Sequence, residues 1–273
     1  MTALIIILSI LWFILLFFCV YAIVLACPVA KAPENKDLLC EYAHRGLHGN
    51  GLPENSLAAF ALACEKGFAI ELDVHLSADK EVMVFHDATL ERMTGEPSKL
   101  ADLTCDELRA LRLSGSEEHI PTLREVLALV DGKVPLLVEL KGESTDVSLC
   151  KEVAPLLREY SGAYCIESFN PLLLAEMRKY LPDAYYGLLY TNVCREKKKF
   201  SLLNAALSCM ALNVLAKPNF IAFDKKYRRS FPVWLTTKFY GAPKYVWTIR
   251  SDEELEVARR RGENAIFERC NNK

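Results

Sequence analysis

The sequence lacks a charge excess, an internal repeat and paired cysteines. Its 33 Lys and Arg residues nearly balance 35 Asp and Glu residues, which leaves a net charge of −2. Because the basic excess typical of nucleic-acid-binding proteins is missing, we expect no nucleic-acid partner. The 10 cysteines are scattered and include no CxxC pair. This spacing disfavours zinc sites and disulfide frameworks, and it favours free thiols in a reducing compartment.

Charge is also missing from a long N-terminal stretch. No charged residue occurs between Thr2 and Ala26, where Leu, Ile, Phe and Val dominate. As a helix, this stretch is long enough to span the roughly 30 Å hydrocarbon core of a bilayer. It lacks a basic n-region, and its apolar part exceeds the roughly 7–15 residues of a cleavable signal peptide. A buried core helix is the less favoured interpretation, because other elements would have to cover this stretch on every side. We therefore predict a single-pass transmembrane anchor at residues 1–27, with residues 2–26 in the membrane.

The charges that flank this anchor predict its direction. No basic residue precedes it, whereas Lys31 and Lys36 follow it in a short linker predicted at residues 28–38. The positive-inside rule then favours a cytoplasmic location for the rest of the chain.

Beyond the linker, β-prone runs alternate with amphipathic helical patterns, which indicates a parallel α/β fold. The length of 273 residues suits one large domain, predicted at residues 39–273. Strands are predicted at Leu39–His44, Ala69–Val74, Val82–Phe85, Val134–Leu140, Ala163–Phe169, Ala184–Leu189, Phe220–Phe223, Tyr245–Ile249 and Ala265–Phe267. Helices are predicted at Ser56–Lys66, Cys105–Leu113, Leu123–Val130, Val147–Tyr160, Pro171–Tyr180, Lys198–Leu212 and Asp252–Arg261.

Nine strands are one too many for an eight-stranded barrel. The gap from Val74 to Val82 is too short for the crossover that a parallel neighbour requires, so we predict that the third run folds back on the second. The other runs then suit a (β/α)₈ barrel, the TIM barrel. Residues 87–121 are interpreted as a small insertion after the second strand, with turn signals at Gly95, Pro97 and Gly115.

Charged side chains follow the ends of several predicted strands. His44 and Arg45 end the first, where barrel enzymes place their catalytic groups. In the second, period-2 alternation puts Glu71, Asp73 and His75 on one face, opposite apolar residues that should face the helices. Two inward carboxylates repel each other and lose hydration, a cost that a cation or basic partners offset.

The fourth predicted strand repeats this pattern with Glu139 and Lys141 on one face. Glu139 can complete a three-carboxylate site, and oxygen ligands select Mg²⁺ or Ca²⁺ over zinc. Lys141 can contact an anionic substrate, although an inward Glu and Lys can also form a structural salt bridge. At the end of the fold-back run, His86 can return to the neighbourhood of His44 as an acid/base partner.

Other histidines have simpler interpretations. His48, in a glycine-rich loop, and His119, beside two glutamates, are interpreted as surface or hydrogen-bonded residues. His75 is either a residue that supports the site from behind or a packing residue.

In combination, the ordered motifs HRG, PENS, ELDV, VFHD, PTL and VELK closely resemble the glycerophosphodiester phosphodiesterase family. The resemblance covers Tyr42 to Ile249 and points to a membrane-anchored member of bacterial type. It implies a TIM barrel with one divalent cation, Mg²⁺ or Ca²⁺. It also implies site roles: His44 and His86 as general acid and base, Glu71, Asp73 and Glu139 as metal ligands, Arg45 and Lys141 as phosphate contacts, and Trp247 in the substrate pocket.

The C-terminal region departs from the family pattern. Arg250 stands where the family often has Asn, and Ala265-Ile266-Phe267-Glu268 replaces its usual Gly-Ile-Ile-Thr-Asp strand. The metal and acid/base residues are unaffected, so we expect differences in substrate contacts rather than in activity. Arg250 adds a positive charge at the pocket rim or is a solvated loop residue, and we favour the second interpretation.

The resemblance implies hydrolysis of glycerophosphodiesters to glycerol 3-phosphate and an alcohol. One alternative is a lysophospholipase D-type hydrolysis of membrane lysophospholipids, which the anchor favours because it holds the site beside the bilayer. A second alternative is a catalytically silent, membrane-tethered binding protein. Loss of a metal or histidine position would favour that reading, and every such position is present.

Overall fold

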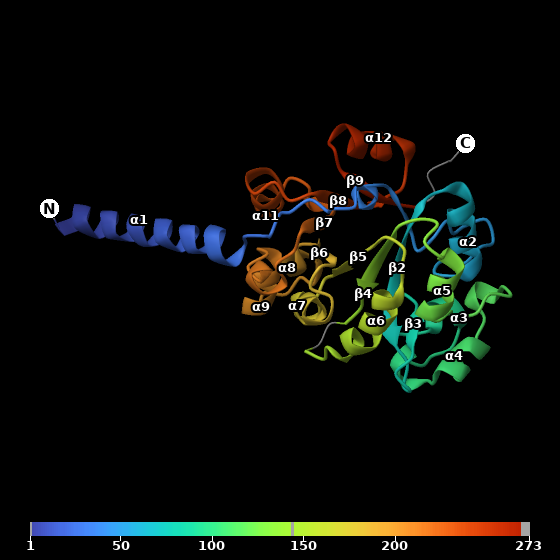
Figure 1. Cartoon of the computed structure of the whole chain (residues 1–273). Helices are drawn as coiled ribbons and strands as arrows, with labels where there is room; N and C mark the ends of the chain where they lie inside the picture. Colours follow the sequence, from blue (N-terminus) through green and yellow to red (C-terminus); the bar gives the residue numbers. More distant parts are fainter. Residues whose placement is uncertain (1, 143–144, 269–273) are drawn as a thin grey trace.

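The structure, a computed structural model, describes residues 2–142 and 145–268. Its N-terminal helix comprises α1 (Thr2–Val20) and a π-helical continuation, η1 (Tyr21–Leu25), and projects away from the rest of the molecule (Figure 1). The segment Leu4–Leu25 is long and apolar enough to cross a membrane, and its most apolar window is 0% buried. A helix of this kind is either a membrane span or a signal sequence. Residue 1, which begins the predicted anchor, and residues 269–273, which end the predicted domain, lie outside the described residues.

Eight parallel strands close into a barrel. Their order is β1, β9, β8, β7, β6, β5, β4, β2, and β1 pairs with β2 to complete the ring. The strands are β1 (Tyr42–His44), β2 (Ala69–Leu76), β4 (Leu136–Leu140), β5 (Tyr164–Ser168), β6 (Tyr185–Tyr190), β7 (Phe220–Asp224), β8 (Lys244–Ile249) and β9 (Asn264–Phe267). The predicted (β/α)₈ barrel is therefore confirmed. The first strand begins at Tyr42 rather than at Leu39, because the chain before it forms a short 3₁₀ helix, η2 (Lys36–Leu38).

The fold-back is also confirmed. Strand β3 (Val82–Val84) pairs antiparallel with the end of β2, and Val74 lies opposite Val84. The insertion that follows contains α3 (Glu91–Thr94), η3 (Leu100–Asp102), α4 (Cys105–Ala110) and η4 (Leu113–Gly115). It has a hydrophobic cluster of its own, in which Leu90, Leu100 and Ile120 are fully or almost fully buried.

Alternation along the strands separates two layers. Residues such as Ile70, Leu72 and Val74 of β2 face outward into the main core, beneath the surrounding helices. The barrel interior is filled by a second cluster of large side chains, including Phe220 and Tyr245. Gly187 of β6 lies beside this filling, where any Cβ would overlap the Phe220 ring. This apolar layer fills the barrel interior and leaves polar inward positions for the carboxyl ends of the strands.

The helices between strands mostly follow the prediction. They are α2 (Leu57–Lys66), α5 (Leu123–Val130), α6 (Ser148–Glu159), α7 (Pro171–Tyr180) and α12 (Asp252–Arg260). Local sequence explains their bounds: Ser56 caps α2, which ends at the left-handed Gly67, and Thr122 with Glu125 forms a capping box at α5.

One predicted helix is wrong. Instead of a single helix at Lys198–Leu212, the structure has three short ones: α8 (Val193–Glu196), α9 (Leu202–Ser208) and α10 (Asn213–Ala216). Positive φ angles at Lys198 and Met210 and a new N-cap at Ser201 divide the segment. The next connection was not predicted, and it contains η5 (Lys225–Tyr227), α11 (Phe231–Trp234) and η6 (Leu235–Phe239). Both segments lie beside the base of α1 (Figure 1).

Candidate active site

The predicted site residues meet at the carboxyl ends of the strands, where barrel enzymes hold their catalytic groups. A cavity of about 220 Å³ is lined by His44, Arg45, Glu71, His86, Glu139, Lys141 and Trp247, among others. The remaining predicted residue, Asp73, is fully buried and contacts Lys141. The fold therefore brings every predicted site residue to one place.

Three carboxylates form the centre of the site. One ligand atom from each of Glu71, Asp73 and Glu139 lies within 4.8 Å of the others. The parallel register explains this, because Asp73 on β2 lies directly opposite Glu139 on β4. Burial raises the pKa of Glu71 well above its usual value, and the neighbouring Asp73 and Glu139 act in the same direction. A cation at this position would relieve both effects.

Two basic side chains contact the same cluster. The Lys141 Nζ atom lies 2.8 Å from Asp73 Oδ1 and 2.7 Å from Glu139 Oε1. The backbone N–H of Arg45 donates to Glu71, and its guanidinium Nε lies 3.4 Å from Asp73 Oδ2. Burial disfavours the charged form of Asp73, yet Lys141 and Arg45 outweigh it and lower its pKa. The positive charges of Lys141 and Arg45 thus keep Asp73 ionised.

A fourth buried carboxyl, Glu167 on β5, was missed by sequence reasoning. It lies opposite Glu139 in the register and lines the cavity. Burial raises its pKa well above the usual range, with Glu139 acting in the same direction, and its Oε2 accepts no hydrogen bond from any described residue. The signal was available, because Glu167 shares with Glu139 an inward position just before the end of its strand.

His44 is held by a residue from the other end of the chain. Its Nδ1 lies 2.5 Å from Glu268 Oε1, and its Nε2 lies 3.9 Å from Glu71 Oε2. Burial lowers the pKa of His44, and the hydrogen bond with Glu268 offsets part of that effect. Sequence reasoning treated Glu268 only as a departure from a pattern. In the structure, its carboxylate holds Nδ1 of the ring and leaves Nε2 on the side of Glu71.

His86 is held in a similar way. Its Nδ1 lies 2.6 Å from Asp87 Oδ1, and Arg92 Nε donates to the other oxygen of that carboxylate. Arg92, from α3 of the insertion, also pairs with Glu54, which in turn pairs with Arg45. Burial lowers the pKa of His86. The insertion therefore supports both sides of the site through one arginine.

The PENS motif has a structural explanation of the same kind. Asn55 Nδ2 donates to Asp73 Oδ2 at 2.8 Å, and the backbone N–H of Asn55 donates to the Arg45 carbonyl. Arg45 and Asn55 both have positive φ angles, 56° and 55°. The loop is thus folded tightly against the strand ends and orients one carboxylate of the cluster.

The other histidines lie around the site rather than in it. His75 Nε2 bonds to the backbone carbonyl of His86 at 3.1 Å, which favours a supporting role over simple packing. His119 lies 3.5 Å from Glu125, the capping residue of α5. Neither His119 nor His48 is among the described residues that line the cavity.

Aromatic and basic side chains form the remaining wall. Trp247 donates its indole N–H to the Ala222 carbonyl and packs edge-on against Phe169, with ring centroids 5.6 Å apart. Arg250 lines the same cavity, and its Nε donates to Glu268 Oε2 at 2.9 Å. The alternative position of Arg250 at the pocket rim is therefore confirmed, and our preferred interpretation as a solvated loop residue is incomplete. Its side chain is exposed, but it holds the carboxylate that orients His44.

A parallel barrel with paired histidines, clustered carboxylates and basic side chains at its strand ends defines a class of (β/α)₈-barrel enzymes. Residues 44–268 match the model of the glycerophosphoryl diester phosphodiesterase family. The chain belongs to this family, and it is a phosphoric diester hydrolase with glycerophosphodiester phosphodiesterase activity. The family binds a divalent metal, and the acidic cluster is the corresponding feature here.

Individual relatives agree with this assignment. A glycerophosphodiester phosphodiesterase of Caldanaerobacter subterraneus subsp. tengcongensis is 30% identical over 239 residues, which are 82% of this chain and 91% of that protein. The lysophospholipase D GDPD1 of Mus musculus is 34% identical over 131 residues, which are 43% of this chain and 40% of that protein. An Oleispira antarctica phosphodiesterase, solved with the product sn-glycerol-3-phosphate, shares the fold at a TM-score of 0.69 and 23% identity, covering 84% of this chain and 92% of that one.

Proposed function

We propose that the chain hydrolyses glycerophosphodiesters to glycerol 3-phosphate and an alcohol, with His44 and His86 as the acid/base pair and with dependence on one divalent cation. The observation that carries this proposal is the shared design of the two histidines. Each has its Nδ1 bonded to a carboxylate, Glu268 or Asp87, and each lines the cavity that holds the carboxylate cluster. Two oriented imidazoles beside one phosphate can protonate the leaving oxygen and deprotonate the attacking water.

The donor set fits a hard cation. Glu71, Asp73 and Glu139 offer only carboxylate oxygens, which suit Mg²⁺ or Ca²⁺, and their mutual repulsion in a buried site favours a bound positive charge. When bound, the ion supplies positive charge to the phosphate oxygens and polarises phosphorus.

The remaining residues bind and orient the substrate. Arg45 and Lys141 are already fixed by ion pairs, so they can hold the non-bridging phosphate oxygens without losing much side-chain freedom. Trp247 and Phe169 offer an apolar wall to the carbon skeleton of the glycerol or the alcohol. Glu268 and Asp87 fix the histidine rings and favour protonation of each imidazole during turnover.

We further propose that residues 2–26 cross a membrane, that residues 1–27 and 28–38 are anchor and linker, and that residues 39–273 form the catalytic domain on the cytoplasmic side. The exposed apolar surface of α1 supports a membrane span. The barrel also places basic residues beside the base of α1, namely Arg195, Lys226 and Arg229. Basic residues on that side of the bilayer agree with the positive-inside rule.

Lysophospholipase D-type hydrolysis is a second candidate function. One relative, from Mus musculus, is named a lysophospholipase D, and it is 34% identical to the chain over 131 residues. A membrane anchor would hold the site where lysophospholipids occur. The reaction uses the same residues, because a lysophospholipid is also a phosphodiester, in which phosphate joins an acylated glycerol to a headgroup alcohol, and water releases that alcohol.

Turnover of glycerophosphocholine, glycerophosphoethanolamine and lysophosphatidylcholine by the purified full chain tests both functions. We expect activity that chelator abolishes and that Mg²⁺ or Ca²⁺ restores. His44→Ala and His86→Ala should each lose about 100- to 10,000-fold in kcat, whereas the matched control His119→Ala should keep its activity. Full activity in either histidine variant would contradict the acid/base assignment. Cation binding without turnover of any substrate would instead support the catalytically silent binding protein.

A further inference from the structure

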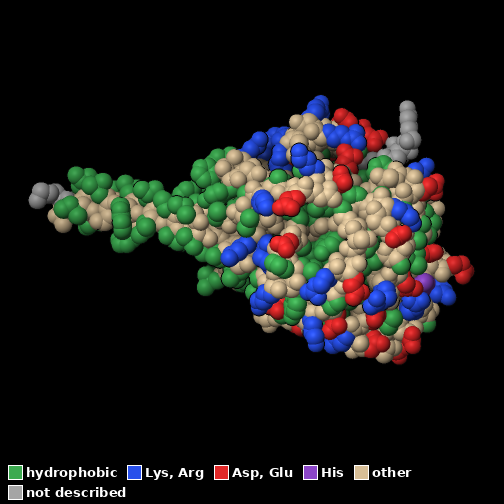
Figure 2. Space-filling view, in the orientation of Figure 1, with side chains coloured by type: hydrophobic (Ala, Val, Ile, Leu, Met, Phe, Trp, Pro, Cys, Tyr) green, Lys and Arg blue, Asp and Glu red, His purple; other side chains and the backbone are tan. Residues whose placement is uncertain are grey.

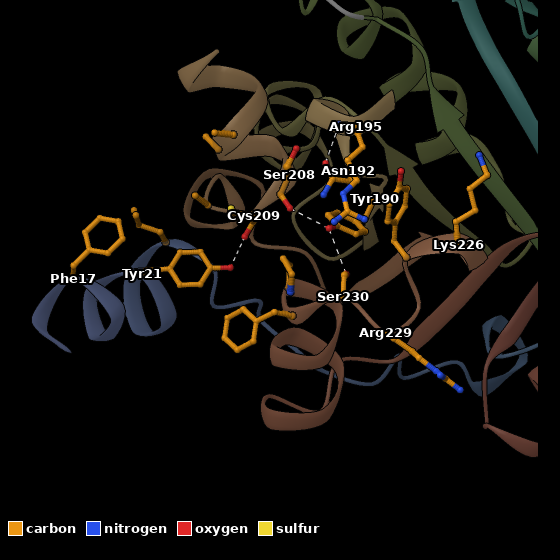
Figure 3. A pocket seen from close by; sticks show the side chains of 17 residues that line it. Phe17, Tyr21, Tyr190, Asn192, Arg195, Ser208, Cys209, Lys226, Arg229 and Ser230 are labelled. Carbon is orange, nitrogen blue, oxygen red and sulfur yellow. Dashed lines mark hydrogen bonds between the residues drawn. The ribbon is translucent and has the colours of Figure 1, made fainter. Parts of the chain in front are cut away.

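The largest cavity near the anchor lies outside the active site. It has a volume of about 820 Å³ and lies between the end of the N-terminal helix and the barrel (Figure 3). Phe17 and Tyr21 form its wall on the helix side, and Tyr190 and Phe231 form part of the barrel side. We call it the junction pocket. Its volume is in the range of pockets that bind small molecules, roughly 300–1,000 Å³.

Specific contacts hold the helix against the barrel and shape this pocket. The Tyr21 hydroxyl donates to the Cys209 carbonyl at 2.6 Å, and the Tyr240 hydroxyl donates to the Ala22 carbonyl at 2.8 Å. Asn213, which is fully buried, donates its side-chain N–H to the Ala26 carbonyl at 2.7 Å. The end of the helix is therefore docked at a defined position, and the space beside it is part of the folded structure.

Apolar side chains extend from α1 onto the adjoining barrel surface. Around the base of the helix, large residues are exposed on α9, α11, η6 and the segment before α9 (Figure 2). They are Phe200 (77%), Leu202 (84%), Leu203 (62%), Phe231 (44%), Trp234 (50%) and Phe239 (66%). Phe231 also contacts Phe18 of α1, with ring centroids 5.8 Å apart. Large exposed apolar residues that gather on one part of a surface mark a contact with a membrane or with another apolar partner.

Basic side chains accompany this apolar surface. Arg195, Lys226 and Arg229 line the junction pocket, and Figure 3 shows Arg195 beside Tyr190. Lys226 lies 3.5 Å from Glu196 and 3.7 Å from Asp224, whereas Arg195 and Arg229 form no ion pair with any described residue. The exposed run Arg195–Lys199 contains four basic residues and one acidic residue, and Phe200 follows it directly. Basic residues next to exposed aromatic and aliphatic ones are typical of surfaces that contact anionic lipid headgroups.

Successive residues of strand β6 line the catalytic cavity and the junction pocket. Leu189 of β6 lines the catalytic cavity, and the next residue, Tyr190, lines the junction pocket. Successive residues of a strand point to opposite faces, so the two cavities lie on either side of the same strand end. The segments that form the barrel side of the junction pocket also leave the carboxyl ends of β6 and β7.

We propose that the junction pocket binds the headgroup of an anionic phospholipid from the bilayer that α1 crosses. The phosphate and negative headgroup lie against Arg195 and Lys226, and the acyl chains lie along α1 beside Phe17. This inference rests on the proposed membrane anchor and is independent of the proposed reaction. A bound lipid fixes the angle at which the helix leaves the barrel, and it places the catalytic cavity close to the headgroup layer.

Titration of the full chain in a neutral detergent with short-chain phosphatidylglycerol or phosphatidylcholine of equal acyl length tests this site. Saturating glycerol 3-phosphate keeps the catalytic cavity occupied, and native mass spectrometry with the shift in Tm reports binding. Phosphatidylglycerol should bind about tenfold more tightly than phosphatidylcholine. Arg195→Glu/Lys226→Glu should abolish the difference, and the milder Arg195→Gln/Lys226→Gln should reduce it if the reversed charges impair folding.

Lys99→Glu/Lys151→Glu is the matched control. Both lysines are exposed, lie outside the junction pocket and form no ion pair within residues 2–142 and 145–268, so this variant should retain the preference. Equal binding of the two lipids by the wild-type chain would overturn the proposal. So would unchanged selectivity in the Arg195 variants, or inorganic phosphate binding as tightly as phosphatidylglycerol. Glycerophosphocholine turnover, measured in parallel on the wild-type chain, distinguishes failure of this site from failure of the proposed reaction.

Discussion

Two regions of the barrel differ in what holds them together. Residues 42–141 supply most of the charged side chains around the small catalytic cavity, and most of these side chains have a partner, as with Arg45, Glu54 and Arg92. Residues 190–240 form short helices with exposed aromatic side chains around a larger cavity. Ion pairs hold the side chains of the first region in place, whereas contacts with the apolar N-terminal helix hold the second. On the proposed function, catalysis and membrane contact therefore lie on opposite faces of the same strand end, that of β6.

The largest expected effect is in the carboxylate cluster. Asp73→Asn should lower glycerophosphocholine turnover by about 1,000-fold and abolish cation binding, because Asp73 is one of three proposed ligands. Glu167→Gln is the matched variant, since burial raises the pKa of Glu167 and an amide resembles its protonated form. It should lose less than about tenfold and keep its cation affinity. Calorimetry with Mg²⁺ and Ca²⁺ measures the cation affinity of each variant. Equal losses of affinity in the two variants would require a four-carboxylate site.

A smaller effect is expected at Glu268, which positions His44. Glu268→Gln should lower kcat about 10- to 100-fold. The carboxylate raises the pKa of His44, so its removal should lower that pKa further. The limb of the pH–rate profile that His44 controls should therefore move to lower pH, whether His44 acts as acid or as base.

The pH profile separates this role from a general loss of stability. Glu256→Gln, on the exposed face of α12, removes a carboxylate that does not line the cavity, and it should leave the profile in place. If the pH–rate profile of Glu268→Gln coincides with that of the wild-type chain, Glu268 does not act through His44.

The two regions also differ in how far the sequence predicted them. The carboxylates and the fold-back of β3 follow from local alternation and from a short gap, which are visible within a few residues. The pairing of His44 with Glu268 joins residues 224 positions apart, and only closure of the barrel creates it. The apolar pattern of Lys198–Leu212 predicted one helix. The segment instead divides into short helices and contacts the N-terminal helix, as the bond from Tyr21 to the carbonyl of Cys209, 188 positions later, shows.

Arg92 tests how strongly the insertion supports the site. Arg92→Gln should lower kcat/KM only about 3- to 10-fold, because Asp87 still bonds His86 and Glu54 still pairs with Arg45. Steady-state kinetics measure this, and Arg112→Gln, an exposed arginine of the same insertion, is the control. A loss as large as that of His86→Ala would show that Asp87 alone cannot orient the ring.

The smallest effect on a soluble substrate is expected for the apolar surface around α1. Phe200→Ser/Leu202→Ser should change turnover of glycerophosphocholine less than about twofold, because exposed residues away from a site contribute little to it. In vesicles, the same variant should turn over lysophosphatidylcholine more slowly than wild type, since less apolar area enters the interface. Tyr180→Ser removes an exposed aromatic residue that lies outside the junction pocket, and it should leave both rates unchanged. If Phe200→Ser/Leu202→Ser slowed both substrates equally, the region would support the catalytic cavity directly, and the division between the two regions would be wrong.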